Sequence, residues 1–290
     1  MTNDTAFWVV QILHGLQFSM LLFLLSVGLT VIFGLLHFVN LAHGALYALG
    51  AYFGYTAASI TGSYWAGFVF APLALMVVGF FLYYGLIRRM RQASAMNQVL
   101  ITFGLIFVFL DIFRIFWGDV ALGVEAPEMF SGPVEFLGIT YSAYRLFIIA
   151  LGLAVMLVLH LILSRTQIGA MIRAGVDNEH MAACLGINVE RVFFTVFCIG
   201  CALAGLAGVV AAPVLSVTPD MGTGILIPTL IVVVIGGLGS LRGAIVGSLL
   251  VGFIQTIGAV IAPQVASVLV YVMLAAVLIV RPAGLFPARS

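Results

Sequence analysis

Long runs of apolar residues, separated by short polar segments, repeat along the whole chain. A transmembrane helix needs about 20 consecutive apolar residues, so a chain of this length has room for about eight to ten crossings. The seventh run is short and contains Pro228. The pattern predicts an all-α polytopic membrane protein with about nine transmembrane helices, some of them discontinuous. The predicted spans are residues 12–35, 42–60, 66–87, 97–117, 144–164, 192–212, 224–238, 243–262 and 266–281.

The composition excludes a soluble domain and several classes of function. Hydrophobic residues make up 64% of the chain and charged residues 7%, whereas soluble domains are nearer half apolar and a quarter charged. The chain has no Lys, which removes the phosphate-binding Lys of a P-loop and the Lys of pyridoxal phosphate chemistry. A net charge of +1 without a basic stripe argues against nucleic-acid binding. We expect no cofactor on this chain, and any ATP to be bound by another subunit.

The positions of the Arg residues predict the orientation, because cytoplasmic connections are enriched in positive charge. Nine of the eleven fall on one side if the predicted spans alternate, and most acidic residues fall on the other. We therefore expect an outer N-terminus and a cytoplasmic C-terminus, with residues 1–290 forming one membrane domain. The nine are Arg88, Arg89, Arg91, Arg165, Arg173, Arg191, Arg242, Arg281 and Arg289.

Two connections are long. The outer one, about 118–143, is rich in Gly, Pro and Glu, and is either a solvated loop or a platform for an extracytoplasmic partner. The inner one, about 165–191, contains an Asp177–Asn178 helix-start signal and a Gly186 stop. It predicts a short amphipathic helix on the cytoplasmic face. In a chain that cannot bind ATP, such a helix suits a docking surface for a cytoplasmic motor.

Polar and glycine residues interrupt two of the apolar runs, one at residues 34–54 and the other at 236–247. Each predicts a helix break, which is tolerated only where protein or a cavity covers it, and transporters place substrate sites at paired broken helices. The polar side chains could line a pathway or gate, form helix–helix hydrogen bonds, or hold a metal, and the nearby GxxxG pairs could serve packing alone. The candidate pathway or gate residues are His37, Asn40, His43, Gly44, Tyr47, Gly236, Gly237, Gly239 and Ser240.

Five stretches, in order over most of the chain, resemble the LivH-type permease subunit of bacterial branched-chain amino acid ABC importers. They are VNLAHGALYALGAY (39–52), IGAMIRAGVDNEHMAACLGINVERV (168–192), GCALAGLAGVVAAP (200–213), VIGGLGSLRGAIVGSLLVGF (234–253) and VRPAGLFP (280–287). The combination is specific, whereas any one glycine-rich piece would be a weak signal.

The resemblance implies a larger machine in the bacterial inner membrane. In this family two permease subunits form the pore, usually this type beside a LivM-type relative. Two ATP-binding subunits drive the cycle from the cytoplasm, and an extracytoplasmic binding protein delivers the substrate. This chain would then be a transport subunit and not an enzyme.

The resemblance also implies that the inner connection is the coupling helix that fits the ATPase. Glu179, Ala182, Ala183 and Gly186 are similar to the importer "EAA…G" motif. The spacing after Glu179 is longer than in the motif, and its later Ile-x-Leu-Pro is missing. We expect Arg173, Asp177 and Glu179 to make the charged contacts to the motor.

The substrate is the least defined part of the prediction. Members of this family carry leucine, isoleucine and valine, and relatives carry other amino acids, amides or urea. No acidic residue lies deep in a span to hold an α-amino group, which favours weak, transient contact in the pore. A stand-alone carrier or channel is the alternative class, but it would usually have a buried charged residue and would not need the 165–191 helix. A homodimeric pore also stays open.

Overall fold

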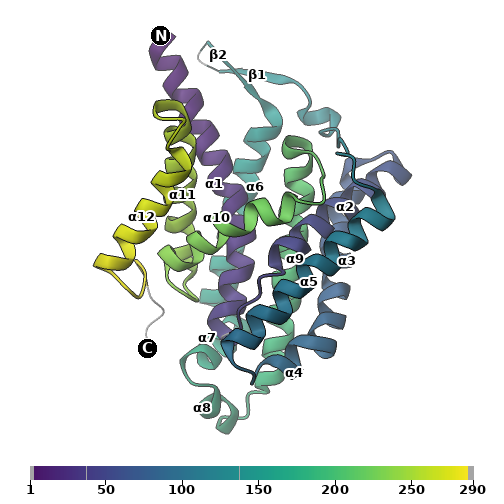
Figure 1. The fold of residues 1–290 in the computed structure, drawn as a ribbon, viewed down its shortest axis with the longest axis vertical. Helices are drawn as coiled ribbons and strands as arrows, with labels where there is room; N and C mark the ends of the chain where they lie inside the picture. The colour runs from purple at the N-terminus through teal and green to yellow at the C-terminus, as the bar shows by residue number, and fades with distance from the viewer. Residues whose placement is uncertain (1–2, 37, 137, 287–290) are drawn as a thin grey trace.

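The computed structural model describes residues 3–36, 38–136 and 138–286. Helices form most of it (Figure 1), which confirms the all-α polytopic fold. They are α1 (Asn3–Leu36), α2 (His43–Thr61), α3 (Tyr64–Leu82), α4 (Arg88–Met90), α5 (Ala95–Trp117), α6 (Ala143–Arg165), α7 (Gln167–Asp177), α8 (Glu179–Cys184), α9 (Val189–Leu215), α10 (Met221–Gly236), α11 (Leu241–Ile261) and α12 (Ala266–Val280). A π-helical segment, η1 (Tyr83–Ile87), joins α3 to α4.

Every one of the nine predicted spans coincides with a helix. Within the described residues, six segments are long and apolar enough to cross a membrane: α1, α3 through α4, α5, α6, α9 and α11. Helices α10 and α12 are apolar but shorter. The 16 residues of α10 reach about 24 Å at 1.5 Å per residue, less than the roughly 30 Å of a bilayer core. The sequence-based expectation of a short seventh span is therefore confirmed.

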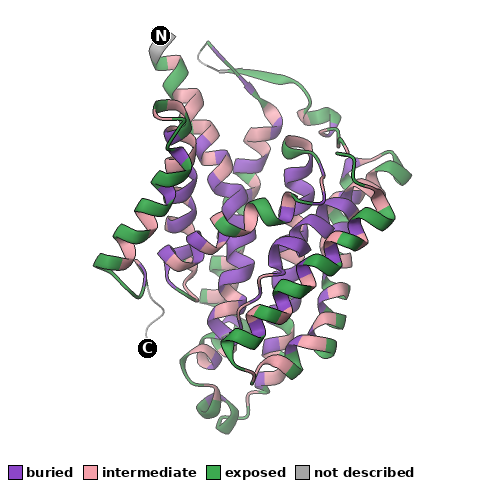
Figure 2. Cartoon of the chain, viewed as in Figure 1, coloured by how far each residue is buried: buried purple, intermediate pink, exposed green. Residues whose placement is uncertain are grey.

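Helix α1 forms the centre of the molecule (Figure 2). Of its most apolar stretch of 18 residues, 89% is buried, whereas the corresponding share is 22% in α3, 22% in α5 and 17% in α6. A helix that is apolar all round is covered by protein or faces lipid. Helix α1 is covered by protein. The outer helices leave much of their apolar surface uncovered, as expected where the surrounding solvent is lipid.

Glycines bring the core helices into backbone contact. A Cβ added to Gly50 of α2 would meet the backbone of Gly205 on α9, and one added to Gly67 of α3 would meet the backbone of Gly54. On α11, Gly243 and Gly247 lie in the same way against the backbone of α10. The GxxxG pairs read in the sequence thus serve close helix packing.

The outer connection is more ordered than a solvated loop. It contains a 3-10 turn, η2 (Glu128–Phe130), and an antiparallel hairpin of β1 (Pro133–Phe136) and β2 (Ile139–Ser142). An isolated bridge joins Leu122 to Val217, between α9 and α10. The hairpin and the start of α1 lie at one end of the molecule, and α4, α7 and α8 lie at the other (Figure 1).

The inner connection forms two helices where the sequence predicted one. Asn178 caps α8, its Oδ1 accepting the Met181 N–H at 2.9 Å, and Gly186 (φ +84°) ends it, so the predicted start and stop are confirmed. The additional helix, α7, is capped by Thr166, whose Oγ1 accepts the Gly169 N–H at 3.1 Å. Gly169 lets α7 lie against the last turn of α6. Because glycine lowers helix propensity, this helix was not apparent in the sequence.

Candidate functional site

The chain between α1 and α2 is non-helical at the position where a break was predicted. Asn40 is buried there, and its carbonyl accepts the His43 N–H at 3.4 Å. His37, the first candidate in this segment, lies outside the described residues. The break is therefore a buried loop inside the helix bundle.

Helix α5 supplies hydrogen-bond partners to this loop. The Val39 N–H donates to Gln98 Oε1 at 3.2 Å, and the Leu41 N–H donates to Thr102 Oγ1 at 3.2 Å. Both α5 side chains are buried. Neither residue was predicted from the sequence, although two polar residues four apart in an apolar span are a usable signal, because such residues usually face the bundle interior.

His43 is fully buried at the start of α2. Its Nε2 lies 3.2 Å from the Leu25 carbonyl of α1, and its Nδ1 has no hydrogen-bond partner in the described part of the chain. No group of three His, Cys, Asp or Glu side chains that could hold a metal gathers among the described residues. The geometry favours helix–helix hydrogen bonding for His43, and a pathway role for it stays a prediction.

The next two candidates, Gly44 and Tyr47, hold α2 between two other helices. Gly44 is in backbone contact with Gly222 of α10. Tyr47 is buried, and its carbonyl faces Gly208 of α9 so closely that no Cβ would fit there. A movement of α10 or α9 must therefore act on α2.

The second break, residues 237–240, is built on two glycines with positive φ, Gly237 at +99° and Gly239 at +78°. Ser240 then caps α11, its Oγ accepting the Gly243 N–H at 3.1 Å. Gly239 is in backbone contact with Gly34 of α1. The two predicted breaks thus meet at the end of α1.

The C-terminal segment covers the C-terminal end of α10, where Ile235 and Gly236 are buried. The Leu285 N–H donates to the Ile235 carbonyl at 2.8 Å, and the Phe286 N–H donates to the Gly236 carbonyl at 3.0 Å. These are among the carbonyls that a helix end leaves without partners. Gly236 is thereby held between the tail and α11.

A cavity of about 440 Å³ opens between α1, α6, α7 and the start of α11. Arg173 and Asp177 line it from α7, and Gly239 and Ser240 line it from the second break. Arg242 contributes a further charge. The structure thus brings two candidate coupling residues and two candidate pathway residues to one cavity.

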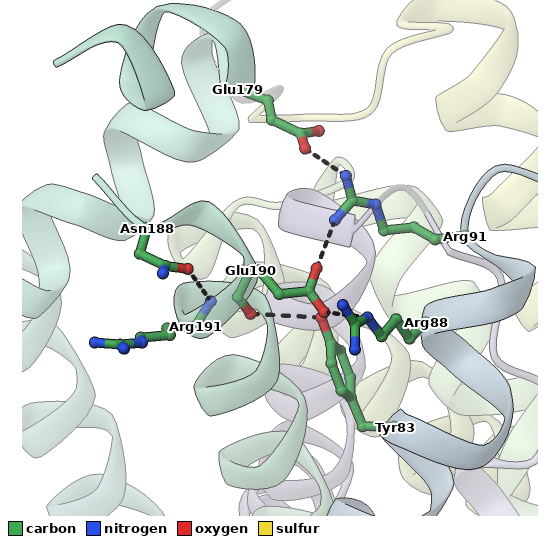
Figure 3. A network of polar contacts seen from close by, with 7 residues as sticks. All are labelled: Tyr83, Arg88, Arg91, Glu179, Asn188, Glu190 and Arg191. Atoms are coloured by element: carbon green, nitrogen blue, oxygen red, sulfur yellow. Dashed lines mark hydrogen bonds and ion pairs between the residues drawn. The ribbon is translucent and has the colours of Figure 1, made fainter. Parts of the chain in front are cut away.

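An ion-pair cluster ties α8 to the rest of the chain (Figure 3). Arg91 pairs with Glu179 of α8 and, at 3.7 Å, with Glu190 of α9. Arg88 pairs with Glu190 at 3.0 Å, and the Arg91 guanidinium lies 4.2 Å from the Phe193 ring centroid. Glu179 is thus engaged within its own chain, whereas Arg173 and Asp177 are exposed.

Helix α8 and the two residues that follow it leave apolar side chains exposed. Met181 is 60% exposed and Leu185 74% exposed, and Ala183 and Gly186 are exposed beside them. Ala182 is buried and packs inward. Of the four motif-like residues, three are therefore wholly or partly accessible from outside and one is structural.

A second cavity, of about 570 Å³, lies at the opposite end of the molecule between the hairpin, α1, α6 and α9. His14, Tyr141 and Arg145 line it. The Tyr141 hydroxyl is buried without a hydrogen-bond partner in the described residues. Burial raises the pKa of Tyr141, and the charge of Arg145 opposes this shift. The hydroxyl stays protonated at neutral pH.

Comparison with known proteins identifies similar chains. A family model described as the permease component of the branched-chain amino acid transport system matches residues 11–278. The high-affinity branched-chain amino acid transport system permease protein LivH of Escherichia coli K12 is 26% identical over 98% of this chain and 97% of its own length. BraD of Pseudomonas aeruginosa, named in the same way, is 27% identical over 96% and 95%. The autoinducer 2 import system permease protein LsrD of Salmonella typhi is 29% identical over 56% of this chain and 51% of its own length. No solved structure gives a significant match.

Proposed function

The chain belongs to the family of branched-chain amino acid transport system permease components and is a multi-pass protein of the inner membrane. From this premise we propose that it is one permease subunit of an ATP-driven, binding-protein-dependent importer. It forms half of the translocation pore, beside a second permease subunit of the LivM type. ATP is bound and hydrolysed by separate subunits in the cytoplasm. An extracytoplasmic binding protein delivers the substrate.

The observation that carries this proposal is the surface of α7 and α8. These helices lie at one end of the molecule, with Met181 and Leu185 uncovered. Large exposed apolar side chains outside the lipid are typical of a protein contact. In a Lys-free chain, a docking surface for a separate motor accounts for them.

The mechanism we propose is alternating access. Closure of the ATPase subunits draws α7 and α8 of the two permease subunits together. Helix α7 lies against the end of α1, since a Cβ on Gly175 would lie 3.1 Å from Leu35 Cδ1. The first break follows α1 in the chain, and the second contacts Gly34 near the end of α1, so a shift of α7 acts on both. Asn40 in the first break, Gly44 and Tyr47 just after it in α2, and residues 236–240 at the second break then open the pore outward and, after hydrolysis, inward.

The substrate we propose is an amino acid with a branched apolar side chain, as the names of LivH and BraD indicate for those proteins. An amide, urea or another small polar solute is the alternative, because LsrD, a partial relative, is named for a different compound. The outer hairpin and the bridged 118–143 connection form the platform for the binding protein.

The direct test is a mild-detergent purification of the tagged chain from its native membrane, with identification of the proteins that accompany it. We expect an ATP-binding subunit and a second permease subunit. The binding protein of the same system can then be titrated with leucine, valine and urea. A chain that purifies alone and transports in liposomes without ATP would be a carrier or channel and would contradict the proposal.

A further inference from the structure

One buried side chain, Gln98, joins the cytoplasmic turn before α5 to the break between α1 and α2. Its amide nitrogen lies within hydrogen-bond distance of the carbonyls of Met90 (3.4 Å), Arg91 (3.4 Å) and Ala93 (3.2 Å). Its Oε1 accepts the Val39 N–H at 3.2 Å. The side chain is 4% exposed. The nitrogen of this amide thus contacts the turn before α5, and its oxygen contacts the break between α1 and α2.

The same turn is attached to α8. The Arg91 side chain pairs with Glu179 of α8 and lies over the ring of Phe193 on α9 (Figure 3). Only 22% of the Arg91 side chain is exposed. Direct contacts therefore run from Glu179 through Arg91 and Gln98 to Val39.

The contact at Val39 matters because the break is non-helical, so its backbone N–H groups lack the carbonyl partners that a helix would provide. A backbone N–H buried in apolar surroundings is costly when it is unpaired. Gln98 and Thr102 satisfy the N–H groups of Val39 and Leu41, and Thr102 is fully buried. The loop cannot leave α5 without losing these bonds, so it moves with α5 and the preceding turn.

We propose that Gln98 is a positioning residue that passes a displacement of α8 to the α1–α2 break. This inference rests on the function proposed above. A pull on α8 acts on Arg91 through the ion pair with Glu179. The turn moves with Arg91, Gln98 follows its carbonyls, and the break follows Gln98. Thr102, one helical turn further along α5, gives the loop a second attachment.

The test is the number of substrate molecules transported per ATP hydrolysed by the assembled importer in proteoliposomes. Gln98→Met keeps the size of the side chain and removes both contacts. We expect normal co-purification with the ATPase, continued ATP hydrolysis, and at least about a fivefold fall in transport per ATP, within the range of allosteric couplings. Gln255→Met is the matched control, because this half-buried glutamine of α11 has no hydrogen bond to the described part of the break.

A second pair of variants covers the case in which Gln98→Met does not fold. Thr102→Val removes the hydroxyl that accepts the Leu41 N–H, and Thr102→Ser keeps it. We expect the first to lower transport per ATP and the second to preserve it. A purely structural role would lower ATPase activity and transport together and leave their ratio unchanged.

A double-variant comparison tests whether Glu179 and Gln98 act on one path. Because members of one path are not additive, Glu179→Gln combined with Gln98→Met should lose no more coupling than the more severe single variant. Fully multiplied losses, or an unchanged ratio in Gln98→Met and Thr102→Val, would overturn the inference. A wild-type importer whose uptake needs no ATP would instead overturn the proposed function.

Discussion

Gly34, near the end of α1, and Gly239, in the loop before α11, lie in direct backbone contact. A Cβ on Gly239 would lie 2.8 Å from the Gly34 Cα, and the reverse substitution meets an even closer atom. This contact joins two breaks that lie far apart in the sequence. Glycine is needed at both positions, and Gly239 additionally has a positive φ of +78°.

Substitution of Gly34 by Ala should therefore separate the two breaks. Overpacking of a tight contact typically costs about 1–3 kcal/mol, and the displaced loop lines the cavity of about 440 Å³ between α1, α6 and α7. We expect a lower thermal unfolding temperature and a loss of most transport by the reconstituted importer. Gly224→Ala on α10, where an added Cβ meets nothing within 4 Å, is the control. Equal behaviour of the two variants would show that the Gly34–Gly239 contact is dispensable.

Much of this arrangement could be predicted from the sequence. The nine spans, the break at Asn40, the Asn178 cap and the Gly186 stop follow from local rules on apolar length, capping and glycine conformation. The paired breaks were also visible as polar or glycine-rich segments. Their contact through Gly34 was not, because it depends on how distant helices pack.

The other contacts that were not predicted from the sequence have the same cause, which is the packing of segments that lie far apart in the sequence. The Gln98 and Thr102 contacts depend on the position of α5 relative to the α1–α2 loop, and the Arg91–Glu179 pair joins segments that are not adjacent in sequence. Helix α7 contains glycines that lower local propensity, but Gly169 fits a tight tertiary contact. Tertiary packing therefore decided the features that local reasoning missed.

The apolar surface of α8 provides a second prediction. A charge at Leu185, as in Leu185→Asp, should abolish co-purification of the ATP-binding subunit, because a buried unpaired carboxylate is costly in an apolar contact. The fold should be unaffected, since Leu185 is 74% exposed. Met129→Asp, at a residue 78% exposed in the outer connection, should leave the complex intact. If Leu185→Asp co-purifies normally, α8 does not contact the ATPase.

The cysteines test the orientation without any substitution. Cys184 is exposed at the end of α8, whereas Cys198 and Cys201 are buried in α9. In vesicles that contain this chain without its ATPase, a membrane-impermeant maleimide should therefore modify one cysteine, identified by peptide mass, when the vesicles are inverted, and none when they are right-side-out. Labelling of Cys184 in right-side-out vesicles would reverse the predicted topology.

A buried tyrosine pair at the N-terminal ends of α3 and α6 makes a fourth prediction. The Tyr144 hydroxyl donates to the Val210 carbonyl at 2.8 Å and lies 2.8 Å from the Tyr64 hydroxyl. Tyr144→Phe should destabilise the protein by about 0.6–2 kcal/mol, the span of values measured for hydrogen bonds between membrane helices. Tyr271→Phe, at a tyrosine 51% exposed on α12, should change the unfolding temperature little. A neutral Tyr144→Phe would show that this network contributes nothing to stability.

The measurement that tests the central claim most directly is uptake of labelled leucine by proteoliposomes containing the purified assembly. ATP is supplied on the side where Cys184 is labelled, and the binding protein on the other side. The account predicts accumulation that needs both, and that disappears when the ATPase subunit cannot hydrolyse ATP. Leucine uptake by this chain alone, without ATP, would contradict it.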